Sequence, residues 1–290
     1  MPIENVSDTA RWVAFYRAME TQRPDALFKD PFARELAGAE GERIVKELPR
    51  GRATAWAMIT RTVVFDEIIL DVVRRHDVDL VLNLAAGLDA RPWRLSLPPS
   101  LRWVDVDLPA MLEYKASHMG KARPNCQYEA VPANLVDEAE RKAVFARFGA
   151  EASSVLVVTE GLLIYLTEQQ VAGLATELHT QPSFRWWLID LASPRLLRMM
   201  TRSWGKALER GNAPFKFGPP NGTDFFTTFG WREATYRSAI EEARRIGREM
   251  PMMWLWRFIG RISSAERRDE MRRMSGFVLL ERAASATGER

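Results

Sequence analysis

Small residues and acids stand at the ends of apolar runs in this 290-residue chain, where they could hold a ligand. The small-residue turn 85–87 follows the apolar run 79–84 directly, and Asp89 lies just beyond it. Small side chains let a ligand approach the backbone, and the next helix directs its positive end there. About 20 residues further on, Asp107 ends a second run, where an acid accepts hydrogen bonds from both hydroxyls of a ribose. The spacing indicates a nucleoside site.

Each of these residues also has a plain structural interpretation. The turn is equally compatible with a tight turn that binds nothing, and Asp107 with a cap on the helix opened by Pro109. Asp105 points to the same side of the strand as Asp107, because side chains alternate, so one of the two is expected to be merely exposed. Only Gly87 remains of the three glycines that seat a pyrophosphate, so a cofactor without phosphates fits better than a dinucleotide.

A sheet is needed to bring these residues together, and the hydrophobic pattern predicts one. Helix-compatible segments alternate with apolar runs at 79–87, 102–109, 153–161 and 183–192 and with a weaker run at 127–131. This alternation predicts a parallel sheet with right-handed crossovers, and therefore a doubly wound α/β fold. A closing run at 276–282 predicts a strand that returns to the sheet edge.

The chain is expected to form one structural domain with appendages. Residues 1–78 have a helical pattern throughout and predict an N-terminal helical lid segment in front of an α/β core at 79–290. An insertion at about 193–230 contains a loop rich in Gly, Pro, Asn and Phe and is expected to cap the carboxyl edge of the sheet. Such edges bind ligands where the strand order reverses.

The composition excludes several classes of protein. With 47% hydrophobic and 27% charged residues and no long biased tract, the chain is typical of an ordinary soluble globular protein. One cysteine and three scattered histidines predict neither a disulfide framework nor a metal site. The net charge of +3 is interleaved, which argues against nucleic acid. Without a signal-like start or a run of about 20 apolar residues, a cytoplasmic protein without a membrane anchor is expected.

Several linked segments, in order along nearly the whole chain, resemble one family. They include TRTVVFDEII, NLAAGLDARPWRL, WVDVDLPAMLEYK, TEGLLIYL and MSGFVLLER. With these the chain resembles the leucine carboxyl methyltransferase family, and most closely the bacterial branch of polyketide carboxyl O-methyltransferases. The resemblance implies a Rossmann-like class I methyltransferase sheet with S-adenosylmethionine as the cofactor.

The resemblance also implies the residues of the cofactor site. Arg61 would hold the cofactor carboxylate, for which a guanidinium offers two parallel donors; the alternative is an ion pair with Asp66 or Glu67 on its own helix. Asp107 would bind the ribose, and Glu160 would lie beside the methionine end, where a carboxylate suits an ammonium or sulfonium. The other residues implied are Ala85, Ala86, Gly87, Asp89, Leu108, Asn134 and Leu135.

Two positions depart from the family pattern, and one role stays open. Asn134 stands where the family commonly has aspartate, and its amide can still bond to the adenine. Ala85 stands where the family often has glycine, so one methyl group must be accommodated, with a modest loss of affinity. Asp89 either recognises the cofactor ammonium or caps a helix.

Methyl transfer from a sulfonium mainly needs proximity, alignment and exclusion of water, so no catalytic residue is assigned. A carboxylate acceptor is ionised at neutral pH and needs no base, whereas a phenol usually does. We expect O-methylation of a carboxylate or hydroxyl on a small, largely apolar or aromatic metabolite, such as a polyketide-type product of secondary metabolism. The alternatives are a protein C-terminal carboxyl methyltransferase and a nucleotide-dependent oxidoreductase with a Rossmann fold.

The acceptor side of the site is only outlined by the sequence. Arg198, Arg202 and Lys216 are candidate partners for an acceptor carboxylate, and nothing selects among them. The oligomeric state is equally open. A set of aromatic residues could wall an acceptor pocket or simply belong to the core: Trp204, Phe215, Phe217, Phe225, Phe226, Phe229, Trp231, Trp254 and Trp256.

Overall fold

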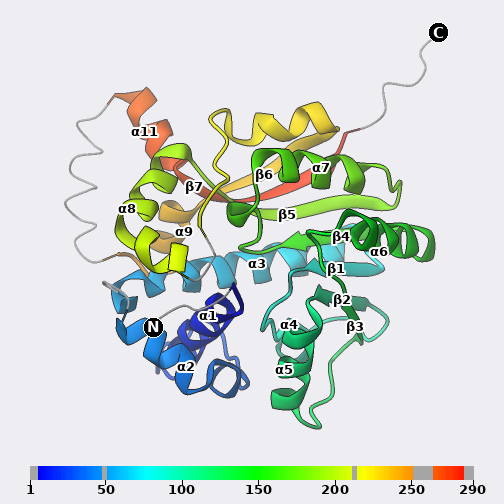
Figure 1. Cartoon of the computed structure of the whole chain (residues 1–290), viewed down its shortest axis with the longest axis horizontal. Helices are drawn as coiled ribbons and strands as arrows, with labels where there is room; N and C mark the ends of the chain where they lie inside the picture. The colour runs from blue at the N-terminus through cyan, green and yellow to red at the C-terminus, as the bar shows by residue number, and fades with distance from the viewer. Residues whose placement is uncertain (1–5, 48–50, 211–213, 251–263, 284–290) are drawn as a thin grey trace.

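One seven-stranded sheet with helices on both faces forms the body of the molecule (Figure 1). The computed structural model describes residues 6–47, 51–210, 214–250 and 264–283. This architecture confirms the doubly wound α/β fold that the alternating runs predict.

The strand order places a crevice beside the first strand. The order across the sheet is β3-β2-β1-β4-β5-β7-β6; the first five strands are parallel, and β7 is antiparallel to both of its neighbours. The chain first adds β2 and β3 on one side of β1 and then crosses over to add β4 and β5 on the other side. The strand order therefore reverses between β1 and β4, and ligands bind at such a switch point. The strands are β1 (Leu80–Leu84), β2 (Arg102–Asp107), β3 (Gln127–Pro132), β4 (Val155–Thr159), β5 (Phe184–Ala192), β6 (Trp231–Ser238) and β7 (Ser275–Arg282).

The last strand does not lie where the sequence predicts it. The run 276–282 is expected at the sheet edge, but β7 lies between β5 and β6, and β6 is the edge strand. Residues 231–238 are mostly polar and only partly buried, so they lack the apolar alternation that indicates a strand. Polar side chains along an edge also protect it from pairing with other chains.

Helices precede the sheet and connect its strands. None of those in the described ranges is long and apolar enough to cross a membrane. The helix-compatible segment that follows the first apolar run forms only the four-residue α4. The helices, with η for 3-10 helices, are α1 (Val6–Thr21), α2 (Ala33–Glu47), η1 (Gly51–Thr54), α3 (Ala55–Arg75), α4 (Arg91–Arg94), α5 (Pro109–Met119), α6 (Glu138–Glu151), η2 (Leu163–Tyr165), α7 (Glu168–His179), α8 (Pro194–Arg210), η3 (Gly222–Phe229), α9 (Ala239–Arg245) and α11 (Ala265–Arg272).

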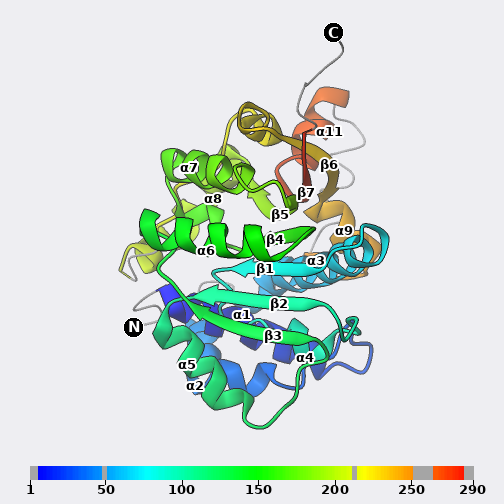
Figure 2. The ribbon, with the colours of Figure 1, turned by 90° about the vertical axis from the view of Figure 1, so that its right-hand side faces the viewer.

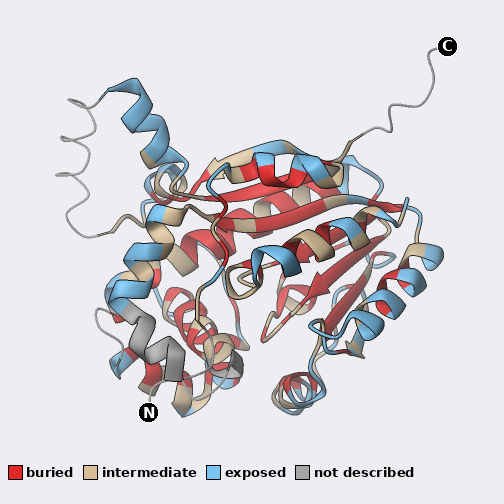
Figure 3. Ribbon diagram, turned by 45° about the horizontal axis from the view of Figure 1, so that its top comes forward, coloured by how far each residue is buried: buried red, intermediate tan, exposed pale blue. Residues whose placement is uncertain are grey.

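The two faces of the sheet are covered by different helices. Figure 2 shows α6 and α7 on one side of the strands and α3 and α9 on the other. Since side chains alternate along a strand, Leu80, Leu82 and Leu84 of β1 join the cluster that contains α6 and α7, while Val81 joins the cluster of α3. The central strands are buried between these layers (Figure 3).

The N-terminal helices pack near the turn that follows β1. Trp12 and Tyr16 of α1 share a cluster with Leu88 of that turn. From the other half of the chain, Arg248 binds the carboxylate of Glu20 on α1, with its Nη2 2.8 Å from Oε1. The fold thus fixes α1 from both sides, and the interpretation of residues 1–78 as a lid and 193–230 as a cap stays a prediction.

Candidate functional site

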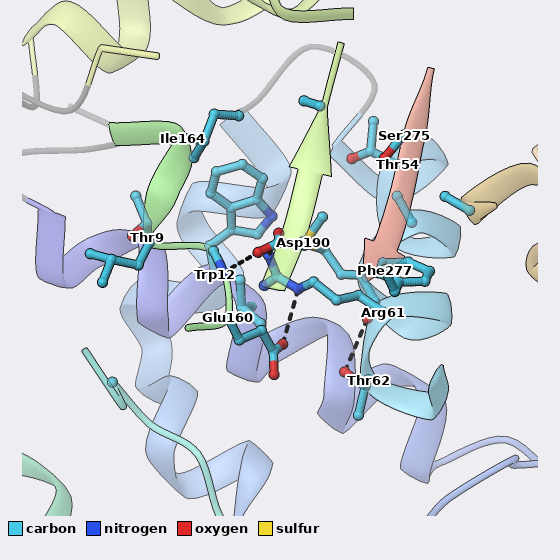
Figure 4. A pocket seen from close by; sticks show the side chains of 18 of the residues that line it. Thr9, Trp12, Thr54, Arg61, Thr62, Glu160, Ile164, Asp190, Ser275 and Phe277 are labelled. Atoms are coloured by element: carbon cyan, nitrogen blue, oxygen red, sulfur yellow. Dashed lines mark hydrogen bonds and ion pairs between the residues drawn. The ribbon is translucent and has the colours of Figure 1, made fainter. Parts of the chain in front are cut away.

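A cavity of about 1150 Å³ lies at the carboxyl edge of the sheet, where the strand order reverses. Its walls come from α1, α3, α8 and α9, and its floor from the ends of β1, β2, β4 and β5. Figure 4 shows part of its lining. Eight of the ten residues predicted for the cofactor site line it: Arg61, Ala85, Ala86, Gly87, Asp89, Asp107, Leu108 and Glu160.

Asp107 joins the end of β2 to the turn after β1. Its Oδ2 accepts the N–H of Gly87 at 2.6 Å, and its Oδ1 accepts the N–H of Leu108 at 2.7 Å. Burial raises the pKa of Asp107, and the two backbone N–H groups oppose that shift. The residue at the N-cap of α5 is Leu108, so Asp107 is not the helix cap of the alternative interpretation. Each carboxylate oxygen keeps a further lone pair, which a ribose hydroxyl can use.

The turn itself has a left-handed backbone. Gly87 has φ +54°, and a Cβ there would lie 3.3 Å from the Cβ of Ala10. Ala85 also has a positive φ, 53°, which costs an L-residue other than glycine about 1 kcal/mol. The extra methyl group at Ala85 is therefore accommodated at the expense of backbone strain.

Arg61 reaches from α3 to the ends of two strands. Its Nε lies 2.9 Å from Oε1 of Glu160, and its Nη1 donates to Oδ2 of Asp190 at 3.1 Å (Figure 4). The side chain is almost fully buried. The alternative ion pair within its own helix is not formed, because Asp66 and Glu67 bind other arginines.

Asp89 belongs to a buried charge network with Arg91 and Glu160. Its Oδ2 accepts a hydrogen bond from Nη1 of Arg91 at 2.7 Å, and that Nη1 lies 2.7 Å from Oε2 of Glu160. Burial alone would raise the pKa of Asp89, but the charges of Arg91 and Lys115 outweigh it and hold that pKa below its ordinary value. Asp89 also accepts the backbone N–H of Arg91 at the start of α4. The N-cap residue of α4 is Ala90, so this bond satisfies the first N–H of the helix without making Asp89 its cap, and recognition of an ammonium by Asp89 stays a prediction.

The expectation that Asp105 or Asp107 is merely exposed is wrong. Asp105 is fully buried, where it forms an ion pair with Lys115 and accepts a hydrogen bond from the amide of Asn83 at 3.0 Å. The same amide donates to Asp89 at 3.2 Å. Asp105 therefore supports the floor of the cavity from below.

Asn134 and Leu135 follow β3 and do not line the cavity. Asn134 is exposed, and its Oδ1 accepts the N–H of Val136 at 3.1 Å. The N–H of Ala133 donates to the carbonyl of Asp107, which keeps this segment beside the end of β2. The adenine contact of Asn134 stays a prediction.

Sequence reasoning missed Asp190, which lines the cavity and binds Arg61. Asp190 lies near the end of the fifth apolar run, much as Glu160 directly follows the fourth strand. The rule that placed Glu160 at the carboxyl edge could have found Asp190 too.

The remainder of the cavity wall is largely apolar, and it includes Met199, Phe215, Phe217, Ile240 and Phe277. Arg198, Arg202 and Lys216 are exposed and do not line the cavity. Of the predicted aromatic set, Phe217, Phe225, Phe226 and Trp231 belong to a core cluster, and Phe229 packs against it. Trp254, Trp256 and the side chain of Trp204 lie outside the described residues.

The charges of the cavity suit a ligand without phosphates. Each arginine in its lining is paired with a carboxylate: Arg17, Arg61, Arg91 and Arg94. α4 has only four residues, so the helix after the turn offers little dipole to a pyrophosphate. Nor do the described residues include a group of three or more His, Cys, Asp or Glu that could hold a metal ion.

Residues 10–179 match the model of the leucine carboxyl methyltransferase family. A protein of Streptomyces coelicolor, described as a candidate S-adenosyl-L-methionine-dependent methyltransferase, is 34% identical over 182 residues, which cover 60% of this chain and 64% of that protein. A relative with the same description in Parafrankia is 33% identical over 183 residues, covering 60% and 58%. The chain thus spans less than two thirds of the length of these relatives.

Two solved structures are similar over nearly the whole chain. A DUF574 family protein from Streptomyces avermitilis has a TM-score of 0.61 at 13% identity, covering 94% of this chain and 97% of that one. A structure described as a candidate methyltransferase from Thermobifida fusca has a TM-score of 0.57 at 13% identity, covering 98% and 97%. These similarities show a class I methyltransferase-like fold. Because the family model matches more than half of its length, the chain belongs to the leucine carboxyl methyltransferase family.

Proposed function

We propose that this protein is an S-adenosylmethionine-dependent O-methyltransferase that methylates a carboxylate of a small, largely apolar acceptor. One observation carries the proposal: a single cavity joins the acids and the arginine expected for the cofactor to a wide apolar wall. The family match and the descriptions of the relatives support the cofactor and the reaction type.

The polar half of the cavity has a partner for each end of the cofactor. Asp107 would accept the two ribose hydroxyls. Arg61 would pair with the carboxylate of the methionine end, and Glu160 would face its ammonium and sulfonium charges. This set suits a zwitterionic nucleoside better than NAD, because the lining holds five acids against four arginines and offers no excess positive charge to a pyrophosphate.

The size of the cavity leaves room for an acceptor. Pockets for one drug-sized ligand hold about 300–1,000 Å³, and this cavity holds about 1150 Å³. Met199, Phe215 and Phe277 on the apolar side of the cavity favour an acceptor that is flat or largely apolar.

Methyl transfer from a sulfonium requires of the protein mainly that it aligns the two reactants. When bound, S-adenosylmethionine supplies an activated methyl group: a bond forms between the acceptor oxygen and the methyl carbon while the carbon–sulfur bond breaks, its electron pair staying on sulfur. A carboxylate acceptor loses no proton in this step, so no general base is needed. The residues of the cavity hold both molecules in line and exclude water.

Calorimetry tests the cofactor. The protein should bind S-adenosylmethionine and S-adenosylhomocysteine and leave NAD unbound. Binding of NAD without binding of either sulfur nucleoside would refute the proposal.

A second experiment tests the acceptor. Incubation with S-adenosylmethionine carrying a labelled methyl group, and with matched panels of apolar acids, phenols and peptides ending in leucine, should label the acids. A base-labile label indicates an ester and supports the proposal. A base-stable label on phenols, or labelling of the peptides alone, contradicts the carboxylate or the small-molecule part of it.

A further inference from the structure

We propose that Gly161 and Asp190 are positioning residues that fix the guanidinium of Arg61 in the direction of the cofactor carboxylate. This inference rests on the function proposed above. It concerns the turn directly after β4 and the end of β5, two segments that the fold brings against the same arginine from α3.

Gly161 gives the guanidinium a surface without a side chain. A Cβ on Gly161 would lie 2.8 Å from Nη1 of Arg61 and 3.5 Å from its Cζ and Nη2. The first of these distances is shorter than two heavy atoms tolerate, so any side chain here displaces the arginine. Gly161 also has φ +69°, a backbone conformation that glycine adopts without strain.

Asp190 binds both of these groups with one carboxylate. Its Oδ1 accepts the N–H of Gly161 at 2.7 Å, and its Oδ2 accepts Nη1 of Arg61 at 3.1 Å. The turn and the guanidinium are therefore held at a fixed separation. Glu160 lies against Nε on another part of the same group, at 2.9 Å.

These contacts preorganise the guanidinium of Arg61 for binding a carboxylate. A guanidinium has five N–H donors, so Arg61 can keep its contacts with Asp190 and Glu160 while donating to a third carboxylate. Since the side chain is already ordered and buried, binding does not have to immobilise it. Displacement of the guanidinium should therefore weaken ligands that carry the amino-acid carboxylate and spare those that lack it.

Two nucleosides separate this effect from a general loss of structure. S-adenosylhomocysteine carries the carboxylate, and 5′-methylthioadenosine has the same adenosine and sulfur without it. Gly161→Ala should weaken binding of S-adenosylhomocysteine by about tenfold or more in calorimetry, with less than about a twofold change for methylthioadenosine. Gly222→Ala is the matched control, because Gly222 has φ +60° with open space around its Cβ position and does not line the cavity.

A second variant keeps the test decisive if Gly161→Ala folds poorly. Asp190→Asn keeps an oxygen for the N–H of Gly161 and removes the charge that holds Arg61, so it should also lower affinity for S-adenosylhomocysteine selectively. Its control is Glu177→Gln, which removes an ion pair of similar exposure with Arg141, away from the cavity.

Combination with Arg61→Ala identifies the route of the effect. If Gly161 acts through the arginine, Gly161→Ala should cost little further affinity once Arg61 is alanine. An equal loss for both nucleosides, a full additional loss in the Arg61→Ala background, or wild-type affinity in Gly161→Ala and Asp190→Asn overturns the inference. If the wild-type protein binds neither nucleoside, the proposed function itself fails.

Discussion

The carboxylate of Asp107 at the end of β2 holds the backbone N–H of Gly87 in the turn after β1, at 2.6 Å. Two residues that are 20 positions apart thus form one rigid unit at the floor of the cavity. The acid expected to bind a ribose also sets the shape of the turn on which the rest of the nucleoside would lie.

Replacement of Asp107 should therefore damage the site in two ways. We expect Asp107→Ala to weaken binding of S-adenosylmethionine at least tenfold, about 1.4 kcal/mol, because the ribose partner and the clamp on Gly87 are lost together. Asp107→Asn is the control of equal shape and should lose less. Calorimetry measures both, and wild-type affinity in the alanine variant would remove Asp107 from the site.

Arg61→Ala should also weaken cofactor binding at least tenfold, about 1.4 kcal/mol, because the cofactor carboxylate would lose its partner and Glu160 and Asp190 would each lose the positive charge of Arg61. Arg61→Lys should recover part of the loss, since it keeps the charge without the two parallel donors. If titrations of wild-type and alanine proteins coincide, the arginine does not bind the cofactor.

The left-handed backbone at Ala85 predicts a stabilising substitution. Ala85→Gly should raise the free energy of unfolding by up to about 0.5 kcal/mol, because relief of the backbone strain outweighs the entropy that glycine loses on folding. Ala86→Gly is the neighbouring control; Ala86 is not among the residues with positive φ, so this change should destabilise the fold. Urea unfolding measures both, and a drop in stability for Ala85→Gly would contradict the prediction.

The charge network around Arg91 predicts a loss of stability in acid. Burial alone would raise the pKa of Asp89 and of Glu160, but the nearby arginines outweigh it and lower both below their ordinary values of 3.8 and 4.5. Groups with a lowered pKa in the folded state stabilise it above their unfolded pKa, and this stabilisation is lost as the pH falls through the folded pKa. The free energy of unfolding should therefore decrease as the pH falls below about 4.5.

Asp89→Asn tests this assignment in the same measurement. The variant should be less stable than the wild type near pH 6, where Arg91 loses a charged partner, and its stability should fall less steeply in acid. Parallel curves for the two proteins from about pH 6 to about pH 3 would show that Asp89 does not contribute to the acid sensitivity.

The sequence predicts the parallel part of the fold well, because most of its strands are apolar runs that alternate with helix-compatible segments; only β3 is more polar and gives a weaker signal. It does not predict the place of β7, since the partner strand β6 is polar and partly exposed and gives no strand signal. The order of strands depends on long-range pairing, which local periodicity does not contain.

The site is predictable to the same extent. Residues at strand ends, such as Asp107 and Glu160, could be placed at one edge because all carboxyl ends of parallel strands meet there. The pairing of Arg61 with Glu160 and Asp190 could not, because it depends on how α3 packs against the sheet. The burial of Asp105 could not be predicted for a related reason. Its charge is balanced by Lys115 of α5, and it accepts a hydrogen bond from Asn83 of β1, so both partners come from other elements.

The position of β7 between β5 and β6 has a consequence for synthesis on the ribosome. β6 leaves the ribosome before the strand that must separate it from β5, so it cannot take its final place until residues 275–282 have followed. During that interval the edge of β5 is open to pairing with another nascent chain. Translation speed between the codons of β5 and β7, over residues 193–282, should therefore influence how much of the protein is recovered without aggregation.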